Sequence, residues 1–187
     1  MVEESKPVVT ITGISGYVGS QTAMAFLKDG SFKVRGTVRS KTNAAKIDPL
    51  RNAFGEFFEQ IELVEADLLD EDSLKAAIAG STYVAHTASP FLIDGPNDDD
   101  YFIRPAVNGT LAVMRACRMA KVKRVVLTSS IVSIMDVPKA KMPAVYNESH
   151  WSDVNRAEGM TPYNKSKTLA EKAAWDFVEA LPEGEKI

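Results

Sequence analysis

Residues 7–19 read Pro7-Val8-Val9-Thr10-Ile11-Thr12-Gly13-Ile14-Ser15-Gly16-Tyr17-Val18-Gly19. The first six of these residues form a β-branched run, which favours a strand, and the residues after Gly16 have helical spacing. Glycines at 13, 16 and 19 suit a tight turn, close approach of the backbone to a pyrophosphate, and close packing of helix on strand. The helix N-terminus would also attract an anion. This order predicts a dinucleotide-binding unit, with a simple glycine-rich turn as the alternative.

The rest of the chain alternates strands with helices. Short β-branched runs predict strands at 32–38, 61–66, 82–86 and 124–128. Helical spacing predicts helices at 70–80, 98–120 and from Tyr163 to Phe177. Because each return to a parallel neighbour needs a crossover, we predict an α/β fold, a Rossmann-like doubly wound parallel sheet with helices on both faces.

Some local features of these elements can also be predicted. Asp70 is a good N-cap for the helix that follows it. Pro49 should divide residues 43–58 into two short pieces, and Pro105 should kink its helix near the beginning. Residues 136–160 are expected to form a long loop.

Length and composition are those of an ordinary globular protein. The chain has 187 residues, of which 45% are hydrophobic and 25% charged, so we expect one domain over residues 1–187. A net charge of -3 argues against nucleic-acid binding, and no stretch approaches the roughly 20 apolar residues of a membrane span. The acidic start and a single cysteine, Cys117, favour a cytoplasmic location. Cys117 is expected to be a buried small hydrophobe rather than a nucleophile.

The end of the second predicted strand bears on cofactor choice. An NAD enzyme usually offers a carboxylate to the ribose about 20 residues after the glycine motif, but here Arg39 is followed by Ser40 and Lys41. A cation suits a 2′-phosphate, so NADP(H) is favoured over NAD(H), although a solvated charge cluster is the alternative. Asp67, after the third strand, could accept a hydrogen bond from the adenine amino group or serve as a turn residue.

A second motif, Tyr163-Asn164-Lys165-Ser166-Lys167, lies near the end of the chain. On a helix, Tyr163 and Lys167 share one face, so an ammonium can lie beside a phenol and favour its ionised form. The tyrosine then becomes a plausible acid at neutral pH. Together with the glycine-rich turn, this motif predicts a hydride-transfer enzyme.

Several motifs in a fixed order extend this prediction. They are Thr12-Gly13-x-x-Gly16-x-x-Gly19, Asp67-Leu68, His86-Thr87-Ala88-Ser89-Pro90, Pro105-Ala106-Val107-Asn108-Gly109, Arg124-Val125-Val126-Leu127-Thr128-Ser129-Ser130 and Tyr163-x-x-x-Lys167. The chain therefore resembles the extended short-chain dehydrogenases/reductases, particularly the dihydroflavonol reductases and the related methylglyoxal and carbonyl reductases. Members of that family continue into a C-terminal substrate-binding region, so the resemblance implies an N-terminal portion that is truncated before it.

The resemblance implies a role for each catalytic candidate. Tyr163 would hand its phenolic proton to the substrate oxygen while the nicotinamide delivers hydride, and Lys167 would support Tyr163 and bind the nicotinamide ribose. Ser130 would orient the carbonyl oxygen, with Ser129 as the alternative because neighbouring strand residues face opposite ways. Asn108 would hold a water for proton relay, or would merely distort its helix.

The resemblance also implies contacts to the cofactor. The implied residues are Gly13, Gly16, Tyr17, Val18, Gly19, Arg39, Lys46, Asp67, Leu68, Thr87, Tyr163 and Lys167. Lys46 would join Arg39 at the 2′-phosphate. His86 is expected to be structural, and His150 and Trp151 to be packing or surface residues. With two histidines and one cysteine, no metal-ligand cluster is visible.

The leading interpretation is an NADPH-dependent reductase of a small-molecule aldehyde or ketone. Residues Phe91, Leu92 and Ile93, with the 136–160 loop, are expected to line the approach of the substrate. One alternative is an NAD-dependent sugar-nucleotide epimerase or dehydratase, which Arg39 disfavours. Another is a non-catalytic NADP-binding fragment or sensor, which has no need of Tyr163 and Lys167. No oligomeric state follows from the sequence.

Overall fold

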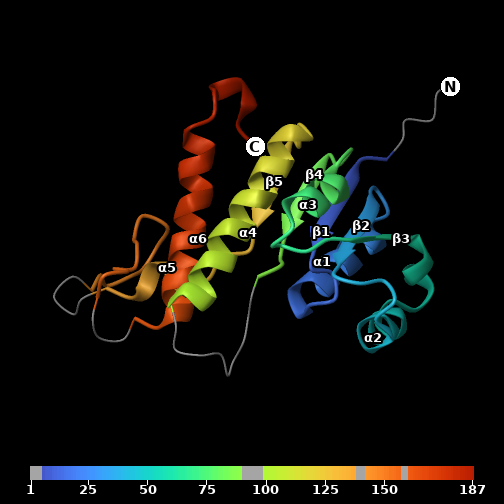
Figure 1. Ribbon diagram of the computed structural model, residues 1–187, viewed down its shortest axis with the longest axis horizontal. Helices are drawn as coiled ribbons and strands as arrows, with labels where there is room; N and C mark the ends of the chain where they lie inside the picture. The colour runs from blue at the N-terminus through green and yellow to red at the C-terminus, as the bar shows by residue number, and fades with distance from the viewer. Residues whose placement is uncertain (1–5, 90–98, 138–141, 157–159) are drawn as a thin grey trace. The chain divides into compact units, whose positions relative to one another are not determined.

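A computed structural model describes residues 6–89, 99–137, 142–156 and 160–187 (Figure 1). The described residues fall into two compact units. The first unit contains the residues up to Ser89, Ala112–Thr128 and Ile187, and the second contains those between 99 and 111 and between 129 and 186. The single domain expected from the chain length stays a prediction.

The first unit is built on a five-stranded parallel sheet, and all five predicted strands are confirmed. The strands are β1 (Val8–Thr12), β2 (Lys33–Val38), β3 (Ile61–Glu65), β4 (Tyr83–His86) and β5 (Arg124–Leu127). Their order is β3-β2-β1-β4-β5, with Val9 of β1 opposite Val34 of β2 and Tyr83 of β4. The order reverses at β1, and doubly wound sheets bind ligands beyond the carboxyl ends of the strands at such a point.

Helices cover both faces of this sheet, as predicted. They are α1 (Tyr17–Asp29), α2 (Ala44–Phe54), the 3-10 helix η1 (Gly55–Gln60), α3 (Glu71–Ile78) and the C-terminal part of α4 (Asp99–Met119). One apolar cluster joins α1 and α2 to the sheet through Ala23, Leu27 and Leu50. A second cluster joins α3 and α4 to the opposite face through residues such as Ile78 and Cys117. The doubly wound α/β fold is confirmed.

Cys117 lies inside the second cluster with none of its surface exposed. Burial raises the pKa of its thiol to about 12. A thiol that stays protonated is a poor nucleophile, so Cys117 is a small buried hydrophobe as predicted.

Residues 44–60 form two pieces, but the break does not come at Pro49. Helix α2 continues through Pro49 and ends at Gly55, whose φ of +54° is in the left-handed region. A proline fixes a helical φ and removes only its own N–H, whereas the buried side chains of Ile47, Leu50 and Phe54 anchor α2 on both sides of it. The backbone therefore changes direction at Gly55 and not at Pro49.

Helix α3 begins with the side-chain cap that the sequence predicts. The Asp70 carboxylate accepts hydrogen bonds from the N–H groups of Asp72 at 3.1 Å and Ser73 at 3.2 Å.

We expect Asp70→Ala to lower the free energy of unfolding by about 1 kcal/mol, because two N–H groups lose their acceptor. Asp70→Asn keeps the acceptor and should lose much less. Urea denaturation measures both, and equal losses for the two variants would contradict the capping role.

The second unit contains α5 (Val132–Met135), α6 (Pro162–Glu179) and the 3-10 helix η3 (Glu183–Glu185), with the N-terminal part of α4. Thr161 caps α6 by accepting the Asn164 N–H at 3.1 Å. Between α5 and α6, the described residues form no helix or strand, which agrees with the expected loop. Helix α4 continues through Pro105, where the kink stays a prediction.

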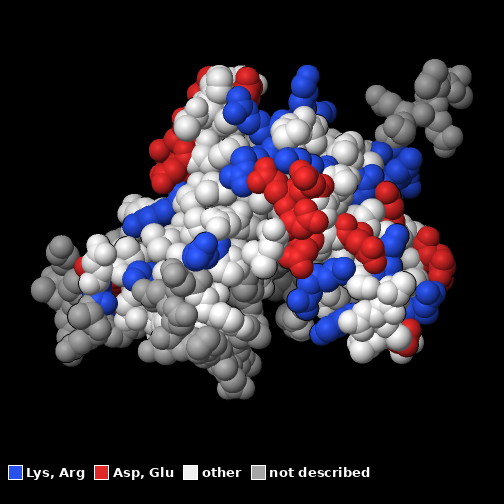
Figure 2. Space-filling model, in the orientation of Figure 1, with Lys and Arg blue, Asp and Glu red and all other residues white. Residues whose placement is uncertain are grey.

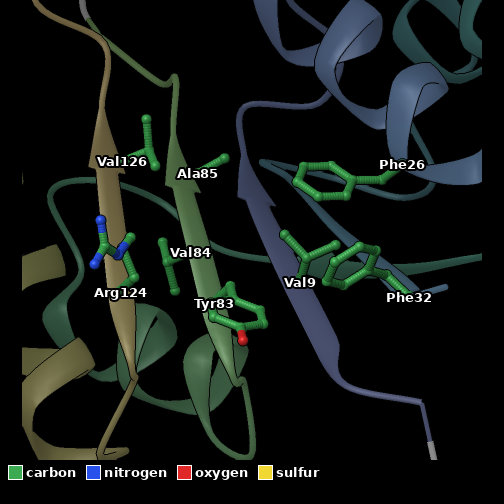
Figure 3. A pocket seen from close by; sticks show the side chains of 8 residues that line it. All are labelled: Val9, Phe26, Phe32, Tyr83, Val84, Ala85, Arg124 and Val126. Carbon is green, nitrogen blue, oxygen red and sulfur yellow. The ribbon is translucent and has the colours of Figure 1, made fainter. Parts of the chain in front are cut away.

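The first unit has an apolar hollow on one face of its sheet, beside strands β1, β4 and β5 (Figure 3). Its lining residues are Val9, Phe26, Phe32, Tyr83, Val84, Ala85, Arg124 and Val126. Phe26 and Phe32 meet edge to face, with 4.9 Å between ring centroids. Val126, on the edge strand β5, is 61% exposed.

Candidate active site

The turn between β1 and α1 requires glycine at its first position. Gly13 has a φ of +70°, which side chains disfavour, and its N–H donates to the Thr37 hydroxyl at 3.0 Å. The Gly16 N–H donates to the Gly13 carbonyl oxygen at 2.9 Å and closes the turn. Thr37 on β2 therefore supports the glycine turn from the neighbouring strand.

Two of the glycines also have no room for a side chain. A Cβ on Gly19 would overlap the Gly13 carbonyl oxygen and lie 2.8 Å from the Thr87 hydroxyl oxygen. A Cβ on Gly13 would lie 3.0 Å from both Cα and Cβ of Ala88. Helix α1 and the residues after β4 thus pack closely against the turn, with no space for a side chain between them. A dinucleotide-binding turn requires such close packing.

The N-terminus of α1 is suited to an anion. Its N-cap, Gly16, makes no side-chain capping bond, and the first turn has no acidic residue. The first N–H groups of a helix need acceptors, and its positive dipole end favours a negative one. Tyr17 and Val18 open the helix with exposed side chains, 87% and 47% accessible. The phosphates of a dinucleotide can therefore accept these N–H groups, because no side-chain cap has to leave them first.

The two cations expected to bind the 2′-phosphate follow β2 in the chain. Arg39 follows β2 directly, Lys46 lies in the first turn of α2, and both are exposed. The connecting residues are held from β3, since Glu65 accepts the Lys41 N–H at 2.7 Å. On the face shown in Figure 2, charges of both signs are interspersed over the first unit.

Asp67 takes part in the turn between β3 and α3. Its carboxylate accepts the Leu69 N–H at 2.9 Å, and its own N–H donates to the Ser73 hydroxyl at 3.0 Å. This is the turn role that the sequence left open beside adenine binding. Leu68 is half-buried and packs against the α3 and α4 cluster.

In the second unit, Tyr163 and Lys167 share a face of α6. The Lys167 ammonium nitrogen lies 6.0 Å from the centre of the Tyr163 ring, and both residues are half-buried. Burial lowers the pKa of Lys167 from its ordinary value of 10.5. The predicted juxtaposition of phenol and amine is confirmed.

The two candidate serines have different partners. Ser129 donates to the Glu171 carboxylate of α6 and lies 3.2 Å from the Ser133 hydroxyl. Ser130 accepts the Val132 N–H in a long bond of 3.4 Å. Glu171 was not singled out from the sequence, although it lies one turn beyond Lys167 on α6. Its contact gives Ser129 a partner on α6.

Asp136 joins three segments of the second unit and was also missed by sequence reasoning. It accepts from the Arg156 guanidinium at 2.6 Å and from the Asn164 side-chain amide at 3.3 Å. Asn164 follows Tyr163, so this contact ties the start of α6 to the residues after α5. No local pattern reveals it, because the partners are 20 and 28 residues from Asp136.

The remaining candidates are located as follows. Asn108 lies on α4 in the second unit with an exposed side chain. Trp151 is half-buried beneath the Lys172 ammonium, 5.1 Å from the ring centre, and the His150 ring packs edge to face on Tyr146. His150 and Trp151 thus both pack against neighbouring side chains. Phe91, Leu92 and Ile93 lie outside the described residues.

The described part of the chain holds neither a metal-ligand cluster nor a membrane-spanning helix. No set of three histidine, cysteine, aspartate or glutamate side chains there could hold a metal ion. None of the helices in the same part of the chain has the length and hydropathy needed to cross a membrane.

The doubly wound sheet and the glycine turn at its switch point define a dinucleotide-binding α/β protein. Residues 9–181 match the NAD dependent epimerase/dehydratase family, and the chain belongs to that family. It is 40% identical to dihydroflavonol 4-reductase of Hordeum vulgare over 181 residues, 94% of this chain and 50% of that relative. It is 42% identical to tetraketide alpha-pyrone reductase 1 of Arabidopsis thaliana, over 95% of this chain and 55% of the relative.

Solved structures show the same relationship. Vestitone reductase from alfalfa (Medicago sativa) superposes with a TM-score of 0.74 at 34% identity, over 93% of this chain and 53% of that one. The yeast methylglyoxal/isovaleraldehyde reductase, whose structure was solved with NADPH, superposes with a TM-score of 0.75 at 30% identity. The match covers 92% of this chain and 53% of that one. The predicted resemblance to extended reductases is confirmed. The chain spans about half the length of these relatives.

Proposed function

We propose that this chain functions as an NADPH-dependent reductase of small aldehydes or ketones. The observation that carries the proposal is the Tyr163 phenol beside the Lys167 ammonium on one face of α6, 6.0 Å from ring centre to nitrogen. All four relatives named above are reductases, and one of their structures holds NADPH, which supports the same chemistry here. The family match alone would equally allow an epimerase.

In the proposed reaction, bound NADPH would supply the hydride. Tyr163 would donate its phenolic proton to the carbonyl oxygen as that oxygen gains negative charge, and Lys167 would stabilise the phenolate left behind. The Ser130 hydroxyl would donate a hydrogen bond to the same oxygen and orient the substrate. Asn108 is proposed to hold a water through which the phenol regains its proton.

The glycine turn fits the cofactor because two of its positions exclude a side chain and α1 has no side-chain cap. We propose that Gly13, Gly16, Tyr17, Val18 and Gly19 hold the phosphates. Arg39 and Lys46 would bind the 2′-phosphate, while Asp67 and Leu68 would lie at the adenine and Thr87 beside the cofactor at the end of β4. Tyr163 and Lys167 would contact the nicotinamide ribose.

Arg39 provides the test of cofactor choice. We expect Arg39→Asp to weaken NADPH binding by about tenfold or more, because a carboxylate repels the 2′-phosphate that a guanidinium attracts. NADH binding should weaken little or improve. Fluorescence titration with both cofactors measures the preference, and Lys123→Asp, with the same change of charge at another exposed site, serves as the control. An unchanged preference for NADPH in Arg39→Asp would contradict the assignment.

The reductase itself is tested by following NADPH oxidation across a panel of aldehydes and ketones. Steady oxidation with a simple carbonyl compound supports the proposal and excludes an epimerase that recycles its cofactor internally. A second candidate is NADPH binding without turnover, for which the glycine turn and the uncapped start of α1 would be sufficient. Tight binding without oxidation of any compound in the panel would favour that second function.

A further inference from the structure

His86, the last residue of β4, lies directly behind the glycine turn. Its side chain is 2% exposed, and its Nδ1 is 2.7 Å from the Thr12 hydroxyl oxygen, on the last residue of β1. The same hydroxyl oxygen accepts the N–H groups of Thr87 and Ala88, each at 3.2 Å. One oxygen atom thus joins the ends of the two strands that flank the switch point.

These contacts determine the tautomer of His86. A threonine hydroxyl has two acceptor positions and one proton. The two N–H groups from Thr87 and Ala88 occupy the acceptor positions of the Thr12 hydroxyl, so its proton is directed at His86 Nδ1. That nitrogen must then be unprotonated, and the imidazole carries its proton on Nε2.

The residues held by Thr12 are the ones that shape the turn. Ala88 lies where a Cβ on Gly13 would come within 3.0 Å, and the Thr87 hydroxyl lies where a Cβ on Gly19 would come within 2.8 Å. The Thr87 hydroxyl also donates to the Thr12 carbonyl oxygen at 2.5 Å. The Thr12 hydroxyl therefore adds two hydrogen bonds, from the Thr87 and Ala88 N–H groups, to the contacts that hold the end of β4 against the glycines.

We propose that His86 is a positioning residue for the cofactor: by accepting the Thr12 proton at Nδ1, it orients the hydroxyl that holds Thr87 and Ala88 against the glycine turn. The proposal rests on the proposed function only in placing NADPH at this turn. It assigns no proton transfer to His86. The structural role expected from the sequence is thereby extended to the cofactor-binding backbone.

The test compares variants that keep or remove the acceptor. Asparagine places its amide oxygen near the position of Nδ1, so His86→Asn should bind NADPH within about threefold of the unmodified chain. His86→Leu removes the acceptor and should weaken binding by about tenfold, the effect of one buried hydrogen bond. Thr12→Val should weaken binding similarly, Thr12→Ser should not, and the double variant Thr12→Val/His86→Leu should lose little more than either single one.

Stability must be separated from positioning. Ile78→Val, in the α3 core, should lower stability through lost packing while leaving the NADPH dissociation constant unchanged. If His86→Leu binds NADPH as the unmodified chain does, or if His86→Asn binds as weakly as His86→Leu, the proposal is overturned. If His86→Leu does not fold, the comparison of Thr12→Val with Thr12→Ser replaces it. Equal NADPH affinities for these two variants would also overturn the proposal. An unmodified chain that fails to bind NADPH would overturn the proposed function as well.

Discussion

Replacing Tyr163 by phenylalanine is expected to lower the rate of carbonyl reduction by about two to four orders of magnitude, the usual contribution of a positioned general acid. The variant lacks only the phenolic oxygen, so the ring that lies 6.0 Å from the Lys167 ammonium should remain in place. NADPH affinity should fall by no more than about tenfold, because the ribose loses one proposed contact while the phosphates stay bound at the proposed glycine turn. Stopped-flow and steady-state measurements of NADPH oxidation, with a parallel binding titration, separate the two effects.

Tyr101→Phe makes the matched control for this result. Tyr101 lies on α4 with its side chain 45% exposed, and it has no assigned role. Its loss of a hydroxyl should leave the oxidation rate unchanged. If Tyr163→Phe reduced carbonyl compounds as fast as the Tyr101→Phe control, the assignment of the acid would be wrong, and a nucleotide-binding function would be the better description.

Replacing Gly19 by alanine is expected to affect both binding and stability. The added Cβ would overlap the Gly13 carbonyl oxygen and crowd the Thr87 hydroxyl, so either the turn or α1 must move. Such overpacking costs about 1–3 kcal/mol of folding free energy. Because the displaced atoms belong to the proposed phosphate-binding turn, NADPH affinity should fall by at least about tenfold. Urea denaturation and fluorescence titration measure the two losses.

Gly184→Ala is the control for this substitution. A Cβ on Gly184 meets no heavy atom within 4 Å, so the change should alter neither stability nor affinity. A Gly19→Ala variant that bound NADPH like Gly184→Ala would show that the turn tolerates a side chain. The dinucleotide would then have to bind elsewhere.

Much of the fold could be predicted because its causes are local. A β-branched run of about five residues is extended on steric grounds, and Asp70 caps α3 through N–H groups two and three residues away. Where two local signals competed, the prediction was incomplete. Pro49 was expected to divide its helix, but the buried side chains of α2 carried the helix to Gly55.

The sequence by itself determined the strands, the doubly wound fold class, the glycine turn and the pairing of Tyr163 with Lys167, since each follows from backbone periodicity or from residues within one helical turn. Only the tertiary structure decided which distant side chains support them: Thr37 beneath Gly13, Glu171 at Ser129, Asp136 at Asn164, and the Thr12 hydroxyl between His86 and the end of β4. These partners are 24 to 76 residues apart. Their hydrogen bonds depend on which strands and helices become neighbours, and no short-range spacing in a sequence encodes that.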